Sequence, residues 1–210
     1  MKFIRCLTGL GAAFLLACSV QAQPVAGRDY LVLDPPRPVA SGKQIEVIEF
    51  FYYGCPICYE AQPHITQWLG AAGDAVSMQR VPAVSRESWE SFGRSYYALE
   101  ALGEVARLHW AVYDNFHFDG SDLKDENAMF DWIGRNGMDR DKFKEIWSSA
   151  ATTAKLDAAR SLLDSFAIKG VPAMIVDGKY LTSARLAGDT KKMMEVVDVL
   201  FRRARQERGN

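Results

Sequence analysis

The sequence predicts an α/β fold in which a block of helices interrupts a strand-containing domain. Three observations predict it. A strand-like run at residues 45–53 leads directly into a helical pattern, residues 85–167 show helical spacing, and a hairpin pattern at residues 173–182 precedes a final helix. The order is therefore β–α–β, helical block, β-hairpin and α. This order predicts one domain at residues 23–84 and 168–210 and an inserted helical domain at residues 85–167.

The composition is that of a globular protein with a substantial core. The chain has 210 residues, of which 49% are hydrophobic and 24% are charged, and its net charge is −1. This length fits one large domain or one domain that carries an insertion. A net charge near zero gives no reason to expect nucleic acid or an anionic surface as the main partner.

Residues 1–22 are typical of a signal peptide. Lys2 and Arg5 form a positive start, Leu10 to Ala17 is an apolar run, and Val20-Gln21-Ala22 resembles a cleavage site with small residues. The apolar run is too short to be a good membrane span. Cleavage after Ala22 removes two positive charges and no negative ones, so the net charge goes from −1 to about −3. The prediction is an exported, periplasmic protein.

A second interpretation of the leader stays open. Leu15-Leu16-Ala17-Cys18 resembles a bacterial lipobox, in which Cys18 would be lipidated and would anchor the protein to a membrane. Leucine at the middle position fits that pattern imperfectly.

The first strand, helix and second strand follow an irregular opening segment at residues 23–42. Tyr30 to Leu33 predicts a short edge strand within that segment. Residues 45–53, rich in isoleucine, valine and aromatic residues, predict a buried strand, and Gly54 allows a tight turn. The helical pattern after this turn is predicted to end at Gly70, and the alternation at residues 75–84 predicts the next strand.

Five sets of apolar residues at helical spacing make up the inserted block. The sets are Trp89, Phe92, Tyr96 and Leu99; Val105, Leu108, Val112 and Phe116; Met129, Trp132 and Ile133; Phe143, Ile146 and Trp147; and Leu156, Ala159, Leu163 and Phe166. The block is too long to be a loop, so it predicts a subdomain. Its aromatic residues are interpreted mainly as core, with a peptide groove as the alternative, and His109 and His117 are interpreted as structural.

The last part of the chain predicts a hairpin and a helix. Asp177-Gly178 separates the strand-like runs 173–176 and 179–182, and this dipeptide is a strong signal for a two-residue hairpin turn. Asp189 suits the N-cap of a final helix. The arginines from residue 202 to residue 208 suit its negative C-terminal end.

The cysteines predict redox chemistry. Of the four, Cys6 and Cys18 lie in the leader, so the exported chain keeps only Cys55 and Cys58. A ring closed over two intervening residues constrains the unfolded chain little, so this pair predicts a carrier of disulfides and not a structural staple. Zinc needs four ligands, and the three histidines are scattered, so no metal site is predicted.

The position of the pair favours Cys55 as the nucleophile. Cys-Pro-Ile-Cys lies where a strand ends and a helix begins, and the first helical turn presents unpaired N–H groups and the positive end of the macrodipole. A thiolate at Cys55 is stabilised there and its pKa falls. Cys58 lies one turn deeper and is expected to be buried. Glu49, six residues before Cys55, is expected either to be buried beside Cys58 or to reach solvent at the strand end.

Two separated motifs carry a resemblance to a known family. They are Glu49-Phe50-Phe51-Tyr52-Tyr53-Gly54-Cys55-Pro56-Ile57-Cys58-Tyr59 and Gly170-Val171-Pro172-Ala173-Met174, with the helical block between them. The chain resembles the thioredoxin fold with an inserted helical domain and, more narrowly, the DsbA family of exported thiol–disulfide oxidoreductases. The resemblance covers nearly the whole chain after the leader.

The resemblance implies a dithiol oxidase that donates its Cys55–Cys58 disulfide to unfolded exported proteins. It implies no cofactor beyond that disulfide, a monomer, and reoxidation by a membrane partner of the DsbB type linked to quinone. It also implies that Glu49 exchanges a proton with Cys58, that the Val171–Pro172 bond is cis and faces the cysteine pair, and that this loop pairs with substrate backbone. An ordinary trans proline is the alternative for Pro172.

The dipeptide between the cysteines departs from the Pro-His found in some relatives. Ile57 cannot supply an imidazole beside the thiolate, so Pro56-Ile57 predicts a weaker oxidant; Ile57 can also serve as an apolar contact for substrates. Two other functions stay open. One is a reductase or isomerase, although the segment before Ser41 leaves no room for the extra domain of a dedicated isomerase. The other is a non-catalytic chaperone that binds peptides.

Overall fold

The computed structural model describes residues 23–209. The predicted leader, its cleavage site and Cys18 lie outside the described residues.

A five-stranded mixed sheet forms the centre of the molecule. In spatial order its strands are β1, β5, β4, β2 and β3; β2 and β3 are parallel, and the other neighbouring pairs are antiparallel. The sequence predicts all five strands, with small differences at their ends. Their bounds are β1 Leu31–Val32, β2 Ile45–Phe51, β3 Val76–Pro82, β4 Ala173–Val176 and β5 Tyr180–Ser183.

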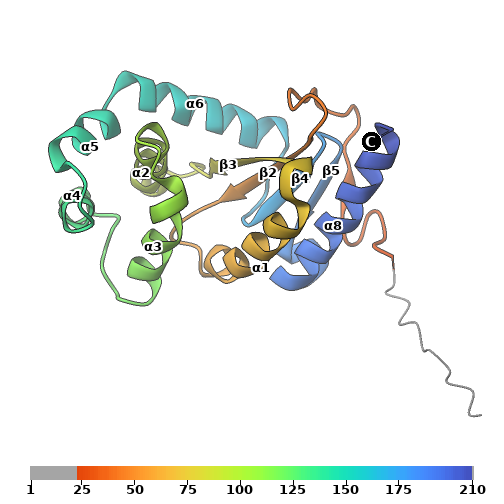
Figure 1. Ribbon diagram of the computed structural model, residues 1–210, viewed down its shortest axis with the longest axis horizontal. Coiled ribbons are helices and arrows are strands. Elements are labelled where there is room, and N and C mark those ends of the chain that lie inside the picture. The colour runs from red at the N-terminus through yellow and green to blue at the C-terminus, as the bar shows by residue number, and fades with distance from the viewer. Residues whose placement is uncertain (1–22, 210) are drawn as a thin grey trace, which may run out of the picture.

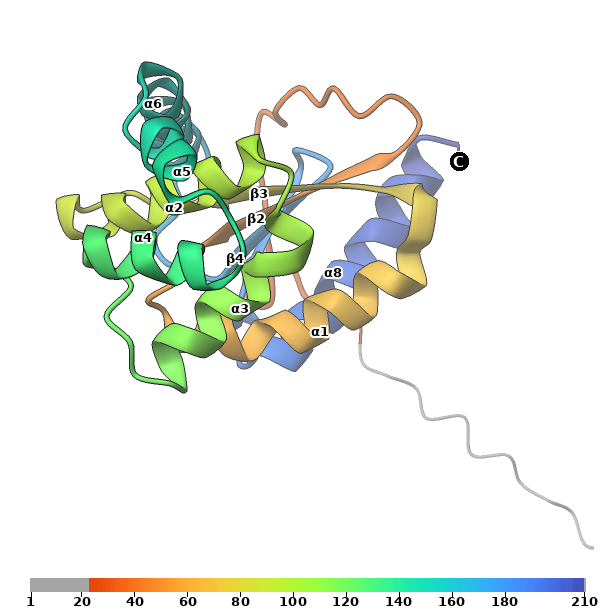
Figure 2. The same ribbon diagram turned by 60° about the vertical axis from the view of Figure 1, so that its left-hand side comes forward.

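Helices cover both faces of this sheet. In Figure 1, α1 and α8 lie side by side below it and α6 runs above it, while Figures 1 and 2 show α2 to α5 gathered at the end away from the C-terminus. The five helices expected in the insertion are all present, between β3 and β4. The helices are α1 Pro56–Ala72, α2 Glu90–Ala101, α3 Val105–His117, α4 Glu126–Arg135, α5 Arg140–Trp147, α6 Ala150–Ser165, α7 Ala184–Ala187 and α8 Thr190–Glu207, with 3₁₀ turns at Gly73–Ala75 and Glu87–Trp89.

Two helix ends illustrate how local sequence sets these bounds. Helix α1 passes the expected end at Gly70 and stops at Ala72, because Gly73 has a positive φ of 54° and its N–H bonds back to the carbonyl of Leu69. Helix α8 begins as expected after Asp189, whose carboxylate accepts the N–H of Lys192. The short α7 is not predicted by the sequence. The domain boundaries at residues 84 and 168 stay predictions.

Strand β2 separates two cores. Ile45 and Val47 point toward α1 and α8, whereas Ile48 and Phe50 point toward the inserted helices, because successive side chains of a strand face opposite sides. All four side chains are buried. A strand covered on both faces explains why this run is almost continuously apolar.

The β4–β5 turn is the Asp-Gly hairpin that the sequence predicts. Asp177 and Gly178 have φ values of 55° and 63°, and the Lys179 N–H bonds to the Val176 carbonyl at 3.0 Å. Positive φ at both central residues is the geometry of a type I′ turn. Gly178 is needed for a second reason: a Cβ there would overlap the backbone carbonyl of Arg37.

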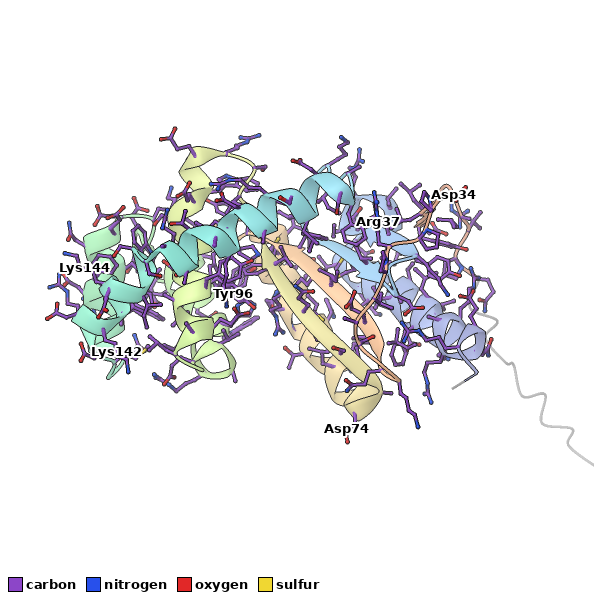
Figure 3. The ribbon with its side chains drawn as sticks, turned by 90° about the horizontal axis from the view of Figure 1, so that it is seen from above. Asp34, Arg37, Asp74, Tyr96, Lys142 and Lys144 are labelled. Carbon is purple, nitrogen blue, oxygen red and sulfur yellow. The ribbon has the colours of Figure 1, made fainter. Side chains whose placement is uncertain are left out.

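The opening segment ties this turn to the end of α6. The Arg37 N–H bonds to the Gly178 carbonyl at 2.8 Å, and its guanidinium donates to the Ser165 carbonyl at 2.6 Å. Figure 3 shows Arg37 beside that end of α6. The Asp34–Pro35 bond in this segment is cis, which the sequence does not predict. These contacts hold the chain where it leaves α6 and returns to the sheet.

Candidate redox site

Cys55 is the N-cap residue of α1. Its backbone is extended, with φ −93° and ψ 116°, and its Sγ accepts the N–H of Cys58 at 3.4 Å. Pro56 occupies the first helical position, where its missing N–H costs nothing because that N–H would lack a helical partner. The helix therefore begins with its free N–H groups gathered around one sulfur, as the sequence predicts.

The two cysteines ionise very differently. The pKa of Cys55 is lowered from 9.0 to about 6, first by a hydrogen bond from the Cys58 thiol and then by the backbone N–H groups of Cys58 and Ile57, which outweigh its partial burial. Burial raises the pKa of Cys58 well above its ordinary value. Both cysteines are free thiols here, and Cys58 is completely buried. The reduced pair is therefore a partly exposed thiolate beside a buried thiol.

The loop before β4 faces this pair. The Val171–Pro172 bond is cis, as predicted, and the carbonyl oxygen of Val171 lies 3.6 Å from the Cys55 Sγ. The same loop borders a cavity of about 270 Å³. The larger apolar side chains that line this cavity are Leu31, Ile168, Val171, Pro172, Leu181 and Leu186.

Glu49 is completely buried in β2, so the alternative in which it reaches solvent is wrong. Its carboxylate accepts the amide of Gln62 at 2.8 Å and the guanidinium of Arg80 at 3.1 Å. Burial raises the pKa of Glu49, and the charge of Arg80 opposes that rise. Sequence analysis does not assign these two partners. The only signal for Arg80 is a cation in the predicted strand at residues 75–84, and it is the register partner of Glu49 across β2 and β3.

The dipeptide between the cysteines lies at the surface. The Ile57 side chain is 42% exposed, and Pro56 is exposed as well. An exposed apolar residue between two reactive cysteines can contact a polypeptide that approaches Cys55. The structure therefore brings together Cys55, Pro56, Ile57, Cys58 and the Val171–Pro172 loop. Glu49 lies in the strand that leads to them.

The predicted core role of the aromatic sets holds for most of their members. Tyr52 stacks on Trp89 at 4.1 Å between ring centroids, and Phe92 and Tyr113 are buried. His109 is buried and bonds to the Tyr53 hydroxyl at 2.8 Å. Two aromatic residues are exceptions, since Trp110 is 41% and Phe118 83% exposed.

Residues 23–209 contain neither a cluster of metal-ligating side chains nor a membrane-spanning helix. No group of three or more histidine, cysteine or acidic side chains in this range is placed to hold a metal ion. None of the helices described combines the length and apolar character needed to cross a bilayer.

A cysteine pair at a helix start, opposed by a cis-proline loop at the end of a mixed sheet, defines a thioredoxin-like protein of thiol–disulfide exchange. Comparisons with known proteins narrow this class. Residues 76–198 match the family described as DSBA-like thioredoxin domain. The chain is 34% identical over 202 residues to the thiol:disulfide interchange protein DsbA of Azotobacter vinelandii, covering 93% of this chain and 94% of the relative. It is 35% identical over 198 residues to that of Bordetella pertussis, covering 94% and 93%.

Solved structures agree. The crystal structure of Pseudomonas aeruginosa DsbA has a TM-score of 0.83 and 31% sequence identity, covering 89% of this chain and 97% of that one. The protein belongs to the DSBA-like thioredoxin family, and it is a thiol:disulfide oxidoreductase.

Proposed function

We propose that the protein oxidises pairs of thiols in newly exported polypeptides by donating a Cys55–Cys58 disulfide. The observation that carries this proposal is the opposite ionisation of the two cysteines, with the pKa of Cys55 lowered to about 6 and that of Cys58 raised by burial. A stabilised Cys55 thiolate favours the reduced form of the pair, and a protein whose reduced form is favoured gives its disulfide away.

The exchange takes place in two steps. A substrate thiolate attacks the Cys55 Sγ, the Sγ–Sγ bond breaks, and its electron pair leaves on Cys58, which takes up a proton. A second substrate thiolate then attacks the substrate sulfur of the mixed disulfide, and Cys55 leaves as a thiolate. The substrate is oxidised by two electrons and the cysteine pair is reduced by two. Of the two protons that the substrate thiols lose, one ends on Cys58 and the other in solvent.

The size of the driving force follows from the Cys55 pKa. A value of about 6 is one unit below neutrality, which favours the reduced form by about 1.4 kcal/mol, or about 30 mV of oxidising power. A pKa near 4 would correspond to about 90 mV. The prediction from Pro56-Ile57 is therefore an oxidant that is weaker than a relative with Pro-His between its cysteines.

The loop opposite the cysteines is the proposed substrate contact. The Val171 carbonyl lies close to the Cys55 Sγ, and Pro172 presents no N–H of its own, so an extended substrate segment can donate to this carbonyl as an added strand would. The apolar cavity beside the loop can take a side chain of that segment. The exposed Ile57 supplies a second apolar contact.

Glu49 is the proposed proton donor and acceptor for Cys58. Burial raises the pKa of Glu49, so this carboxyl group takes up a proton more readily than an exposed one does, and it can return that proton after the mixed disulfide is resolved. Gln62 supports this role because it bonds both the Glu49 carboxylate and the Cys58 carbonyl, at 2.8 and 3.4 Å.

The signal-like leader supports a location in the periplasm, where disulfides form and persist. We expect a quinone-linked membrane partner of the DsbB type to reoxidise the pair. We also expect a monomer that needs no cofactor beyond its own disulfide and does not bind nucleic acid. Lipid attachment at Cys18 remains the alternative for the N-terminus, and mass spectrometry of the exported protein decides between a free Gln23 and a lipidated Cys18.

The test combines a redox equilibrium, which gives the reduction potential, with trapping of the mixed disulfide. The oxidised protein is equilibrated with glutathione, and it is assayed for the refolding of a reduced, disulfide-containing substrate. Cys55→Ser should abolish oxidation, whereas Cys58→Ser should accumulate a mixed disulfide through Cys55. A reduction potential as low as that of a cytosolic reductant would refute the oxidase direction. Full refolding activity of Cys55→Ser would instead indicate a chaperone.

A further inference from the structure

The last turn of α3 contacts Tyr53, which lies two residues before Cys55. The Nε2 of His117 lies 2.7 Å from the backbone carbonyl oxygen of Tyr53. Tyr53 belongs to the turn between β2 and α1, and the carbonyl of its neighbour Tyr52 accepts the N–H of Cys55 at 3.0 Å. A side chain of the inserted helices thus holds the peptide group next to the one that anchors Cys55.

The same imidazole also contacts the residue that follows the motif. The ring of His117 stacks on the ring of Tyr59, with centroids 5.2 Å apart and planes within 8°. The N–H of Tyr59 bonds to the Cys55 carbonyl at 3.1 Å, and its hydroxyl donates to Asp114 of α3 at 2.6 Å. His117 therefore lies against both flanks of Cys-Pro-Ile-Cys, and Asp114 fixes the second flank to the same helix.

The chemistry of this contact is set by the carbonyl group. A carbonyl oxygen can only accept, so the Nε2 of His117 carries the proton of the bond. The oxygen is the negative end of the Tyr53 peptide dipole. A thiolate at Cys55 is favoured when this oxygen points away from the sulfur and accepts a hydrogen bond from another group. If this donor is lost, the Tyr53 carbonyl can rotate. The N–H groups that converge on Cys55 then lose their fixed direction.

We propose that His117 is a positioning residue for the redox reaction: its hydrogen bond to Tyr53 fixes the turn from which Cys55 is presented and so helps to keep that cysteine ionised. This inference deepens the proposed function and rests on Cys55 being the exchanging cysteine. It assigns to the inserted helices a part in the chemistry, in addition to their part in the core.

Three variants of the mature, full-length protein test the proposal. His117→Leu removes the donor and the flat ring, His117→Gln keeps an N–H donor of similar reach, and His64→Leu makes the same change on α1, outside the motif. The readouts are the Cys55 pKa from thiolate absorbance, the rate of mixed-disulfide formation with glutathione, and the denaturant midpoint of the oxidised protein as a measure of folding.

We expect His117→Leu to raise the Cys55 pKa by about half a unit to one unit, because one hydrogen bond of about 1 kcal/mol corresponds to a three- to tenfold change in an ionisation equilibrium. His117→Gln should restore most of the original pKa, and His64→Leu should leave it unchanged. A purely structural role would lower the denaturant midpoint and leave the Cys55 pKa where it is.

Two results overturn the proposal: an unchanged Cys55 pKa in His117→Leu, or a His117→Gln variant that behaves like the leucine variant. Failure of the proposed function gives a different result from failure of the positioning role. In that case Cys58→Ser traps no mixed disulfide through Cys55, whatever residue occupies position 117. If trapping succeeds and the His117 variants titrate like the parent protein, only the positioning role is lost.

Discussion

The lowered pKa of Cys55 predicts that the reduced protein becomes more stable as the pH rises from 5 to 8. A group whose pKa is lower in the folded state stabilises that state fully above its unfolded pKa, and this contribution is lost as the pH falls through the folded pKa. For Cys55 these limits are 9.0 and about 6. Cys58 does not reverse the trend in this range, because its raised pKa matters only where an unfolded thiol ionises, near pH 9.

The magnitude follows from the same two values. Three pKa units correspond to about 4 kcal/mol of stability above pH 9, and integration from pH 5 to pH 8 gives about 2.6 kcal/mol. Cys55 is partly exposed, so solvent screening reduces this figure, and we expect roughly 1–1.5 kcal/mol. With a urea slope of about 2 kcal/mol per molar, the midpoint should rise by about 0.5–0.8 M.

The assay is urea unfolding at pH 5 and pH 8 with a non-thiol reductant present. Other groups titrate in this range, Glu49 among them, so the quantity to compare is the pH-dependent change in the parent protein minus that in Cys55→Ser. Oxidised protein is a second control, since a disulfide sulfur does not ionise. A difference of zero between the parent and Cys55→Ser would show that Cys55 keeps its proton in the folded state, and the argument for the oxidase direction would fail with it.

Three further predictions concern the stability of the fold. Arg80→Met should destabilise the protein by about 3 kcal/mol in chemical denaturation, because it leaves the buried Glu49 carboxylate without its cation. The double variant with Glu49→Gln should recover part of this loss, and strictly additive effects of the two substitutions would contradict the pairing. Gly178→Ala should reduce the free energy of unfolding by about 1 kcal/mol more than Gly42→Ala does, because both glycines have positive φ but only a Cβ at Gly178 meets a backbone carbonyl. Equal shifts in the thermal midpoint would refute this. Phe143→Ala should lose about 3–5 kcal/mol of stability from the core of the inserted helices and leave the Cys55 pKa unchanged, as a thiolate titration under native conditions can check.

Local sequence patterns predicted those parts of the fold that depend on neighbouring residues. The Asp177-Gly178 turn needs two residues with positive φ in succession, and that preference can be read from the dipeptide itself. The helix start at Cys55 is equally local, because Gly54 and Pro56 determine where a helix can begin. The five helices of the insertion follow from apolar spacing for the same reason.

The environment of Glu49 shows where this reasoning ends. Its burial follows from its place in a central strand, but its partners are set by register and docking. Arg80 lies 31 residues away in sequence and faces Glu49 only because β2 and β3 pair in parallel at that register. His117 is 64 residues from Tyr53, and its contact depends on how α3 packs on α1. A histidine within an aromatic helix gives no sign of such a contact, so the sequence led only to a structural interpretation of His117.

One helix end accounts for the opposite behaviour of the two cysteines. Because an α-helix advances 1.5 Å per residue and turns once in 3.6, a cysteine three positions after the N-cap lies one turn inside the helix on nearly the same face as the cap. The cap sulfur therefore meets the free N–H groups, while the second sulfur is carried into the core, where burial holds its proton. The Cys58 thiol can then donate to the Cys55 thiolate, so the burial that raises one pKa also helps to lower the other. One residue between the cysteines would instead place the second sulfur about 160° around the helix from the first, whereas two intervening residues leave only about 60° between them, so the two sulfurs can meet.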